Sequence, residues 1–150
     1  PAGGVNTPSF EAYLSSGQSI SDSVATKVQF NTERFDTDSC YDNSTNYRFT
    51  PTTAGKYFVY SNVQHRMSGY DIYVAKTMIY KNGSQHCATN TASNTSSILA
   101  HPVTISAIID MNGSSDYVEI FGFIAGHGGG GNSFDAGTAN CYFGAFRIIE

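Results

Sequence analysis

The chain has 150 residues, a length that suits one domain with a hydrophobic core of its own. Only 13% of the residues are charged, with 8 basic against 12 acidic side chains and no cluster of lysine or arginine. This balance excludes the basic surface that nucleic-acid binding requires. No apolar run approaches the ~18 residues of a membrane-spanning helix, so we expect no membrane insertion.

Hydrophobic residues recur with the period of β-strands, and almost no helical pattern is present. Residues 1–8 have the character of a linker or boundary segment, and residues 9–150 form the predicted domain. In chain order, the predicted strands are Ser9–Leu14, Lys27–Phe30, Tyr47–Thr50, Lys56–Gln64, Tyr73–Tyr80, Val103–Met111, Tyr117–Ala125 and Cys141–Ile149. Many short strands between Gly, Asn, Ser and Pro clusters predict an all-β sandwich or jelly roll.

The strand pattern is clearest between residues 103 and 125. From Val103 to Met111, apolar residues alternate with mainly polar ones, which is typical of a strand with one buried face. Asn112–Ser115 then has the composition of a turn, and the extended pattern resumes at Tyr117. We therefore predict a hairpin here.

Two predicted strands, Lys56–Gln64 and Cys141–Ile149, are apolar on both faces. A sandwich buries only one face of each strand in its own core, so a second aromatic face indicates burial against another subunit. We assign to the subunit interface Tyr57, Val59, Phe143 and Ala145, and to the core Phe30, Phe49 and Phe146.

The aromatic and glycine skeleton carries a family resemblance. In order and spacing, the residues Phe30, Asp36, Tyr41, Phe49, Gly55 and Tyr57 resemble the complement C1q-like domain of the C1q and tumour necrosis factor superfamily. Further motifs of that domain resemble TMIYKNGS (77–84), SAIIDMNGSSDYVEI (106–120) and FGAFRI (143–148). The resemblance implies a ten-stranded jelly roll that forms a compact homotrimer, with a binding surface on the loops at its outer end.

A glycine-rich stretch, IAGHGGGGNSFDAG, surrounds His127 near the C-terminus. A phosphate-binding loop would need a following Lys-Ser/Thr pair and a helix, which this stretch lacks, so we predict a surface loop at 126–132. Neither a GxSxG nor an HExxH motif occurs, and the four histidines have no metal-binding spacing. The sequence therefore predicts a protein that is not an enzyme.

Calcium is the only cofactor that the sequence suggests, and only weakly. The candidate ligands are Asp36, Asp38 and Asp42, but Tyr41 stands where the glycine of an EF-hand belongs. Some C1q-like trimers hold axial calcium through carboxylates after the YKNG motif, and residues 81–109 contain no Asp or Glu. We therefore expect no cofactor, with calcium at these aspartates as the alternative.

Three cysteines, Cys40, Cys87 and Cys141, lie too far apart for a CxxC motif. We expect free thiols, with one disulfide and one remaining thiol as the alternative.

Ligand contact is expected on loops, because rigid β scaffolds carry binding residues on their connections. The candidate residues are Tyr70, Asp71, Tyr73, His86, His127, Asn132 and Asp135. Tyrosine gives wide amphipathic contact at low entropic cost, and asparagine, serine and glycine adapt their hydrogen bonds, as in antibody loops. A cell-surface glycan or protein is the expected ligand.

The Asn/Ser/Thr-rich, lysine-poor composition resembles that of C1q-like modules at the ends of viral or phage fibres. This resemblance implies an attachment head at a virion surface. The alternatives are a secreted, extracellular protein of animal C1q type in innate recognition or receptor signalling, and a purely structural trimerisation knob.

Overall fold

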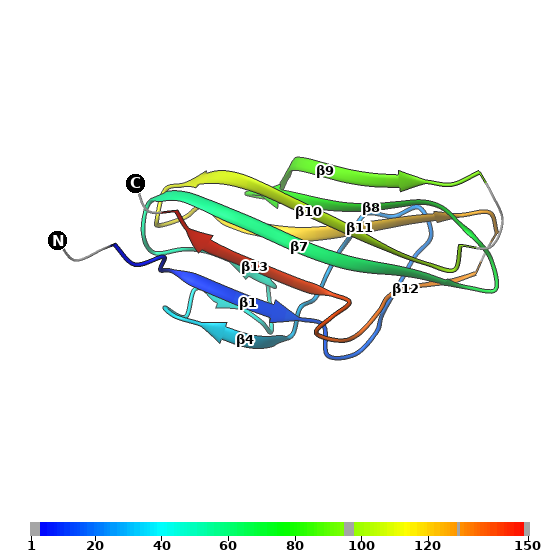
Figure 1. Cartoon of the computed structure of the whole chain (residues 1–150), viewed down its shortest axis with the longest axis horizontal. Coiled ribbons are helices and arrows are strands. Elements are labelled where there is room, and N and C mark those ends of the chain that lie inside the picture. Colours follow the sequence, from blue (N-terminus) through cyan, green and yellow to red (C-terminus); the bar gives the residue numbers. More distant parts are fainter. Residues whose placement is uncertain (1–3, 95–97, 129, 149–150) are drawn as a thin grey trace.

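A computed structural model describes residues 4–94, 98–128 and 130–148, and every regular element in these ranges is a β-strand. Two antiparallel sheets pack face to face as a sandwich (Figure 1). The strands are β1 Ser9–Tyr13, β2 Gln18–Ile20, β3 Thr26–Lys27, β4 Thr32–Asp36, β5 Tyr41–Asp42, β6 Arg48–Phe49, β7 Gly55–Ser68, β8 Ile72–Lys81, β9 Ser84–Ala92, β10 Ala100–Met111, β11 Val118–Gly126, β12 Gly131–Phe134 and β13 Tyr142–Arg147. The predicted all-β sandwich is confirmed, although the described residues form thirteen strand segments rather than ten.

The longest strand, β7, organises the seven-stranded sheet. Its first half pairs with β13 and its last residues with β12, while β10 pairs along its other edge. β1 and β4 continue the sheet beyond β13, and β2 continues it beyond β12. The six-stranded sheet has the order β5-β6-β11-β8-β9, with β3 also paired to β11.

The predicted hairpin at residues 103–125 is wrong. A turn does form, because the side-chain oxygen of Asn112 accepts hydrogen bonds from the backbone N–H groups of Ser114, Ser115 and Asp116. However, β10 pairs with β7 in one sheet, whereas β11 pairs with β8 in the other. Across the sandwich β10 lies against β8 and β9, and β11 lies against β7, so the turn connects the two sheets.

The hairpin of the YKNG motif joins β8 to β9. Asn82 and Gly83 have φ values of 52° and 77°, the left-handed pair that a type I′ turn requires. Strand β9 is absent from the predicted strands because its sequence has no apolar alternation. It is the edge strand of its sheet and is exposed along most of its length. The turn at Asn82 and Gly83, rather than the sequence of β9, sets the position of β9.

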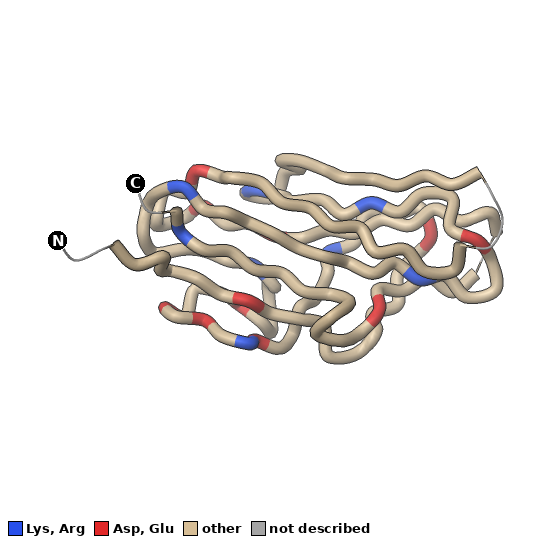
Figure 2. Tube along the Cα trace, viewed as in Figure 1, with Lys and Arg blue, Asp and Glu red and all other residues tan. Residues whose placement is uncertain are grey.

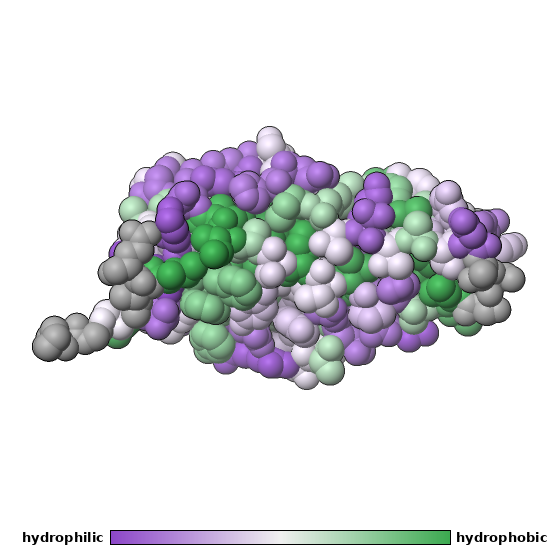
Figure 3. Space-filling view, turned by 45° about the horizontal axis from the view of Figure 1, so that its top comes forward, coloured by the Kyte–Doolittle hydropathy of each residue, from purple (hydrophilic) through white to green (hydrophobic). Residues whose placement is uncertain are grey.

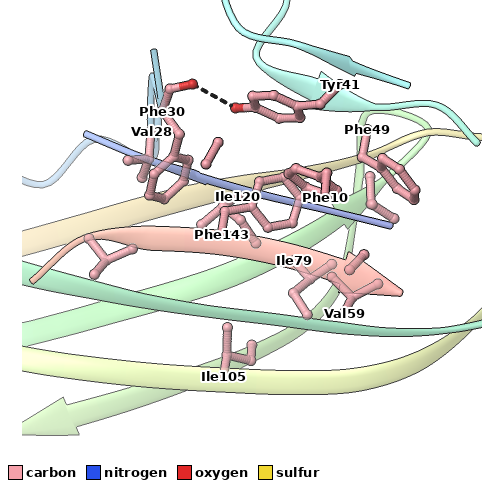
Figure 4. Packing of buried hydrophobic residues seen from close by; sticks show 14 of the residues in the cluster. Phe10, Val28, Phe30, Tyr41, Phe49, Val59, Ile79, Ile105, Ile120 and Phe143 are labelled. Atoms are coloured by element: carbon pink, nitrogen blue, oxygen red, sulfur yellow. Dashed lines mark hydrogen bonds between the residues drawn. The ribbon is translucent and has the colours of Figure 1, made fainter. Parts of the chain in front are cut away.

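Aromatic rings fill the centre of the sandwich (Figure 4). Phe10 stacks between Tyr41 and Phe49, with ring centroids 4.5 and 4.6 Å apart, and Phe143 meets it edge-on at 4.8 Å. The Tyr41 hydroxyl donates a hydrogen bond of 3.0 Å to the carbonyl of Phe30. The predicted core residues Phe30 and Phe49 are fully buried.

The assignment of faces on β7 and β13 was wrong. Tyr57, Val59, Phe143 and Ala145, which we had assigned to a subunit interface, are all buried in the core of the single chain. Phe146, which we had assigned to the core, points outward and is 37% exposed. Both faces of these strands are apolar, so the sequence pattern does not determine which face turns inward.

One buried histidine ties the two sheets together. His65 on β7 is fully buried, and its Nε2 lies 2.8 Å from the carbonyl oxygen of Lys76 on β8. The Phe134 ring meets the imidazole edge-on at 5.5 Å. Burial lowers the pKa of His65 from 6.5 to about 4, so the ring is neutral in the folded protein at neutral pH.

We predict that this histidine makes the fold sensitive to acid. Between pH 6.5 and 4 the unfolded chain binds a proton at residue 65 that the folded chain does not, so stability falls as the pH falls. The free energy of unfolding should drop by about 2–3 kcal/mol between pH 7 and 4.5 from this group alone. Urea unfolding of the wild type and of His65→Gln at both pH values measures it; an equal pH dependence in the two proteins would contradict it.

Candidate functional site

Two surfaces stand out on the described residues: an aromatic face on one sheet and a loop cluster at one end. The aromatic face is the outward side of the seven-stranded sheet, where Ile108, Phe58 and Phe146 lie in one row across β10, β7 and β13. Ile108 is 59% exposed, and the rings of Phe58 and Phe146 are 5.4 Å apart. Figure 3 shows a hydrophobic patch on the surface near the end that bears the termini.

Tyr60 stands in the next row of the aromatic face. Its ring covers Gly144 so closely that a Cβ on that glycine would lie 2.4 Å from ring atoms. The Tyr60 hydroxyl donates a 2.6 Å hydrogen bond to Glu11, whose other carboxylate oxygen pairs with Arg34 at 2.7 Å. Burial, reinforced by Glu11, raises the pKa of Tyr60 far above its ordinary value, so the hydroxyl stays a donor.

The aromatic face can bury a partner. Contiguous exposed apolar residues on a sheet of this size are typical of protein interfaces. Phe58 and Tyr60 belong to the face of β7 opposite the predicted interface residues Tyr57 and Val59, so the sequence pattern did not identify them as members of this surface.

The loop cluster, which we call the tip, comprises residues 69–71 between β7 and β8 and residues 127, 128 and 130 between β11 and β12. It contains three predicted ligand residues, Tyr70, Asp71 and His127, and a fourth, Tyr73, lies next to it at the start of β8. The backbone N–H of His127 donates to the carbonyl of Asp71 at 3.0 Å, which joins the two loops. The ring centroids of Tyr73 and His127 lie 5.1 Å apart in an edge-to-face arrangement.

The other predicted ligand residues are not at the tip. His86 lies on β9 beside the β8–β9 turn, near Tyr80, whereas Tyr73 is at the opposite end of β8. Asp135 directly follows β12. Its two carboxylate oxygens accept hydrogen bonds from Nε of Arg66 on β7, at 2.7 and 2.8 Å.

Asn132 was expected in an exposed loop, and this is wrong. It is buried in β12, and its side-chain amide donates to Asp22 at 2.9 Å. The predicted loop at 126–132 is shorter than expected, because Gly126 belongs to β11 and Gly131 begins β12. Strand pairing of Asn132 with Met67 turns its side chain inward, where it supports the tip rather than contacting a ligand.

The structure does not gather the three candidate calcium ligands into one site. Asp42 accepts hydrogen bonds from the backbone N–H groups of Thr45, Ser44 and Asn46, and these hold the pKa of its carboxyl well below the usual range. Asp36 accepts the backbone N–H of Tyr41 at 2.8 Å. Within the described ranges no group of three or more His, Cys, Asp or Glu residues could hold a metal ion. These carboxylates stabilise turns.

The three cysteines are free thiols, with Cys40 and Cys141 buried and Cys87 half-buried on β9. Over the part of the chain that the structure describes, no helix is long and apolar enough to cross a membrane.

Comparison with known proteins agrees with the architecture. No protein-family model matches the sequence, and no curated protein sequence is significantly similar. Among solved structures, Eiger TNF from S. frugiperda is similar over 95% of this chain and 92% of its own, with a TM-score of 0.68 and 9% identity. The globular domain of zebrafish complement 1qA is similar over 96% and 99% of the two chains, with a TM-score of 0.66 and 15% identity.

Murine APRIL is a third similar structure, over 93% of this chain and 99% of its own, with a TM-score of 0.65 and 10% identity. These likenesses span the whole sandwich at low sequence identity. The chain therefore has the jelly-roll fold shared by complement C1q globular domains and tumour necrosis factor proteins.

Proposed function

We propose that the chain is the non-enzymatic, trimeric head of a viral or phage fibre or virion decoration, which attaches to a glycan or protein at a cell surface. The observation that carries the proposal is that the chain ends and the tip lie at opposite ends of the molecule. The described chain ends lie at one end of the sandwich, and the tip lies at the other (Figure 1). A stalk joined at the terminal end would therefore present the tip outward.

The aromatic face supports assembly as a homotrimer. A closed ring of three copies uses a heterologous interface, so each copy contributes two different surfaces that meet. The row of Ile108, Phe58 and Phe146 supplies one apolar surface, and its exposure in the single chain gives assembly a hydrophobic driving force.

A second candidate is a secreted, extracellular head of animal C1q type, acting in innate recognition or receptor signalling. The likeness to the zebrafish complement 1qA domain favours it. The abundance of Asn, Ser and Thr and the scarcity of lysine favour the virion proposal. Both candidates place the ligand contact at the tip, and a purely structural knob would have no such contact.

The test compares binding of the fluorescently labelled wild-type chain with binding of the double variant Tyr70→Ala, His127→Ala to bacterial and animal cells. Both side chains lie on the tip surface, so the double variant should bind at least about tenfold more weakly because three sites are lost at once. Preference for bacterial cells supports a phage head, and preference for animal cells fits an animal virus or the secreted candidate.

The matched control is Phe35→Ala, which removes an aromatic side chain of similar exposure on β4, away from the tip. All three proteins should have the same mass and melting temperature. If the double variant binds as well as the wild type, the ligand site lies elsewhere. If the wild type binds no cell, the chain is a structural knob.

A further inference from the structure

The side chain of Tyr70 is held as a rigid platform by glycine backbone. A Cβ on Gly128 would lie 2.4 Å from a ring carbon of Tyr70, and one on Gly130 would lie 3.0 Å from another. The ring therefore lies directly on the backbone of these two residues, where no larger side chain fits. Tyr70 is still 50% exposed, so the side of the ring away from the glycines faces solvent.

A second aromatic pair lies beside this platform. Tyr73 is 43% exposed and packs against His127, the residue that immediately precedes Gly128 in the chain. The loop of Tyr70 is anchored to the loop of His127 by the hydrogen bond from the His127 N–H to the Asp71 carbonyl. The aromatic surfaces are thus ordered before any ligand arrives, which lowers the entropic cost of binding.

The tip is an acidic surface. No lysine or arginine occurs between Lys81 and Arg147, and none occurs between Arg66 and Lys76, so the tip loops carry no basic side chain except His127. Figure 2 shows acidic positions at this end of the molecule. Asp71 lies in the tip itself, and no described residue donates a hydrogen bond to its carboxylate.

The two basic residues that flank the tip are already engaged. Arg66 is paired with Asp135 through two contacts, and Lys76 rests over the ring of Phe123 at 4.9 Å. The charge of Arg66 is therefore already balanced by Asp135, and neither basic residue belongs to the tip loops that hold Tyr70. A sialylated or sulfated sugar would meet the Asp71 charge without a compensating cation.

We propose that the tip binds an uncharged pyranose ring of a cell-surface sugar, stacked on the open side of Tyr70. The C–H groups on one side of a pyranose carry partial positive charge and complement the negative face of an aromatic ring. The hydroxyl groups of the sugar donate hydrogen bonds to the Asp71 carboxylate. The inference rests on the proposed function, because it names the ligand of the same attachment surface.

The expected affinity of one tip is weak, since a single ring and one carboxylate give few contacts. Three tips on one rigid head bind a multivalent sugar surface about 10²–10⁴-fold more tightly than a single tip does. Binding should therefore be visible on dense glycan arrays and weak for a free monosaccharide.

The test uses arrays of immobilised glycans that end in galactose, glucose, mannose or N-acetylglucosamine, together with sialylated and sulfated glycans. The intact chain should bind at least one neutral class and none of the anionic ones. Tyr70→Ala should weaken that binding at least about tenfold, whereas Tyr70→Phe, which keeps the ring, and the control Phe35→Ala should retain it. Gly128→Ala should also weaken binding, because the new Cβ displaces the Tyr70 ring.

Preferential binding to anionic glycans, an undiminished signal with Tyr70→Ala, or no binding to any glycan would each overturn the inference. A separate measurement distinguishes this failure from failure of the proposed function. If cells stripped of glycans by glycosidases still bind the wild-type chain, the head attaches to a protein: the proposed function stands and the sugar inference falls. If cells bind only while their glycans are intact and neutral, both hold.

Discussion

Replacing Phe49 with alanine is expected to lower the free energy of unfolding by about 3–5 kcal/mol. Phe49 is fully buried, stacks on Phe10 at 4.6 Å and meets Tyr57 edge-on at 5.7 Å. Alanine would remove the transfer free energy of the ring and leave a cavity between the two sheets that these neighbours cannot fill. A loss of this size is a large part of the stability of an ordinary domain.

The matched control is Phe35→Ala, because Phe35 is 48% exposed on β4 and its removal leaves no internal cavity. It should change the free energy of unfolding by less than about 1 kcal/mol. Chemical denaturation of both variants and the wild type measures the difference. A Phe49→Ala protein with the melting temperature of the wild type would mean that the strand register around β6 is wrong.

Replacing Phe146 with arginine is expected to convert the proposed trimer into folded monomers. In the single chain Phe146 is 37% exposed, so an arginine at this position can reach water without disturbing the core. In the assembled head the same arginine would be buried three times against apolar neighbours such as Phe58, without a partner. The cost of an unpaired buried charge is several kcal/mol per site, enough to prevent assembly.

Tyr73→Arg is the control for this prediction, since it introduces the same charge at an exposed aromatic position of the tip and should leave the trimer intact. Analytical ultracentrifugation gives the mass, and circular dichroism shows whether each variant is folded. A folded Phe146→Arg trimer would place the subunit contact on another surface, whereas an unfolded variant is resolved by the milder Phe146→Ser.

Much of the fold follows from local patterns in the sequence. Alternation in Val103–Met111 predicts a strand because one of its faces is buried, and the Asn82–Gly83 pair predicts the turn at which β8 reverses into β9. The pairing of these strands does not follow so directly. A turn at Asn112 fits both a hairpin and a crossover between sheets, and only the packing of the whole sandwich decides between them.

Which face of a strand turns inward could not be read from β7 and β13. Phe58 and Tyr60 are as hydrophobic as Tyr57 and Val59, so period-2 alternation gives two equivalent solutions. The solution depends on the one-residue register of each strand, because a shift of one position exchanges the faces. The sequence therefore indicates an assembly surface without naming its residues.

The tip was partly predictable. Tyr70, Asp71, Tyr73 and His127 were found from loop composition, and the structure places them together. The contact that the glycines permit was not visible in the sequence, where they predicted only a surface loop. Their role is steric: Gly128 leaves room for the Tyr70 ring, a contact between loops more than fifty residues apart in the chain.

The mass of the unmodified chain in solution tests the central claim most directly. Light scattering at micromolar concentration should give about 48 kDa, three times the 16.1 kDa of one chain, because in the proposed trimer the aromatic face of each copy is covered by a neighbour. A mass of 16.1 kDa at that concentration would contradict the account, since the row of Ile108, Phe58 and Phe146 would then face water in the functional protein.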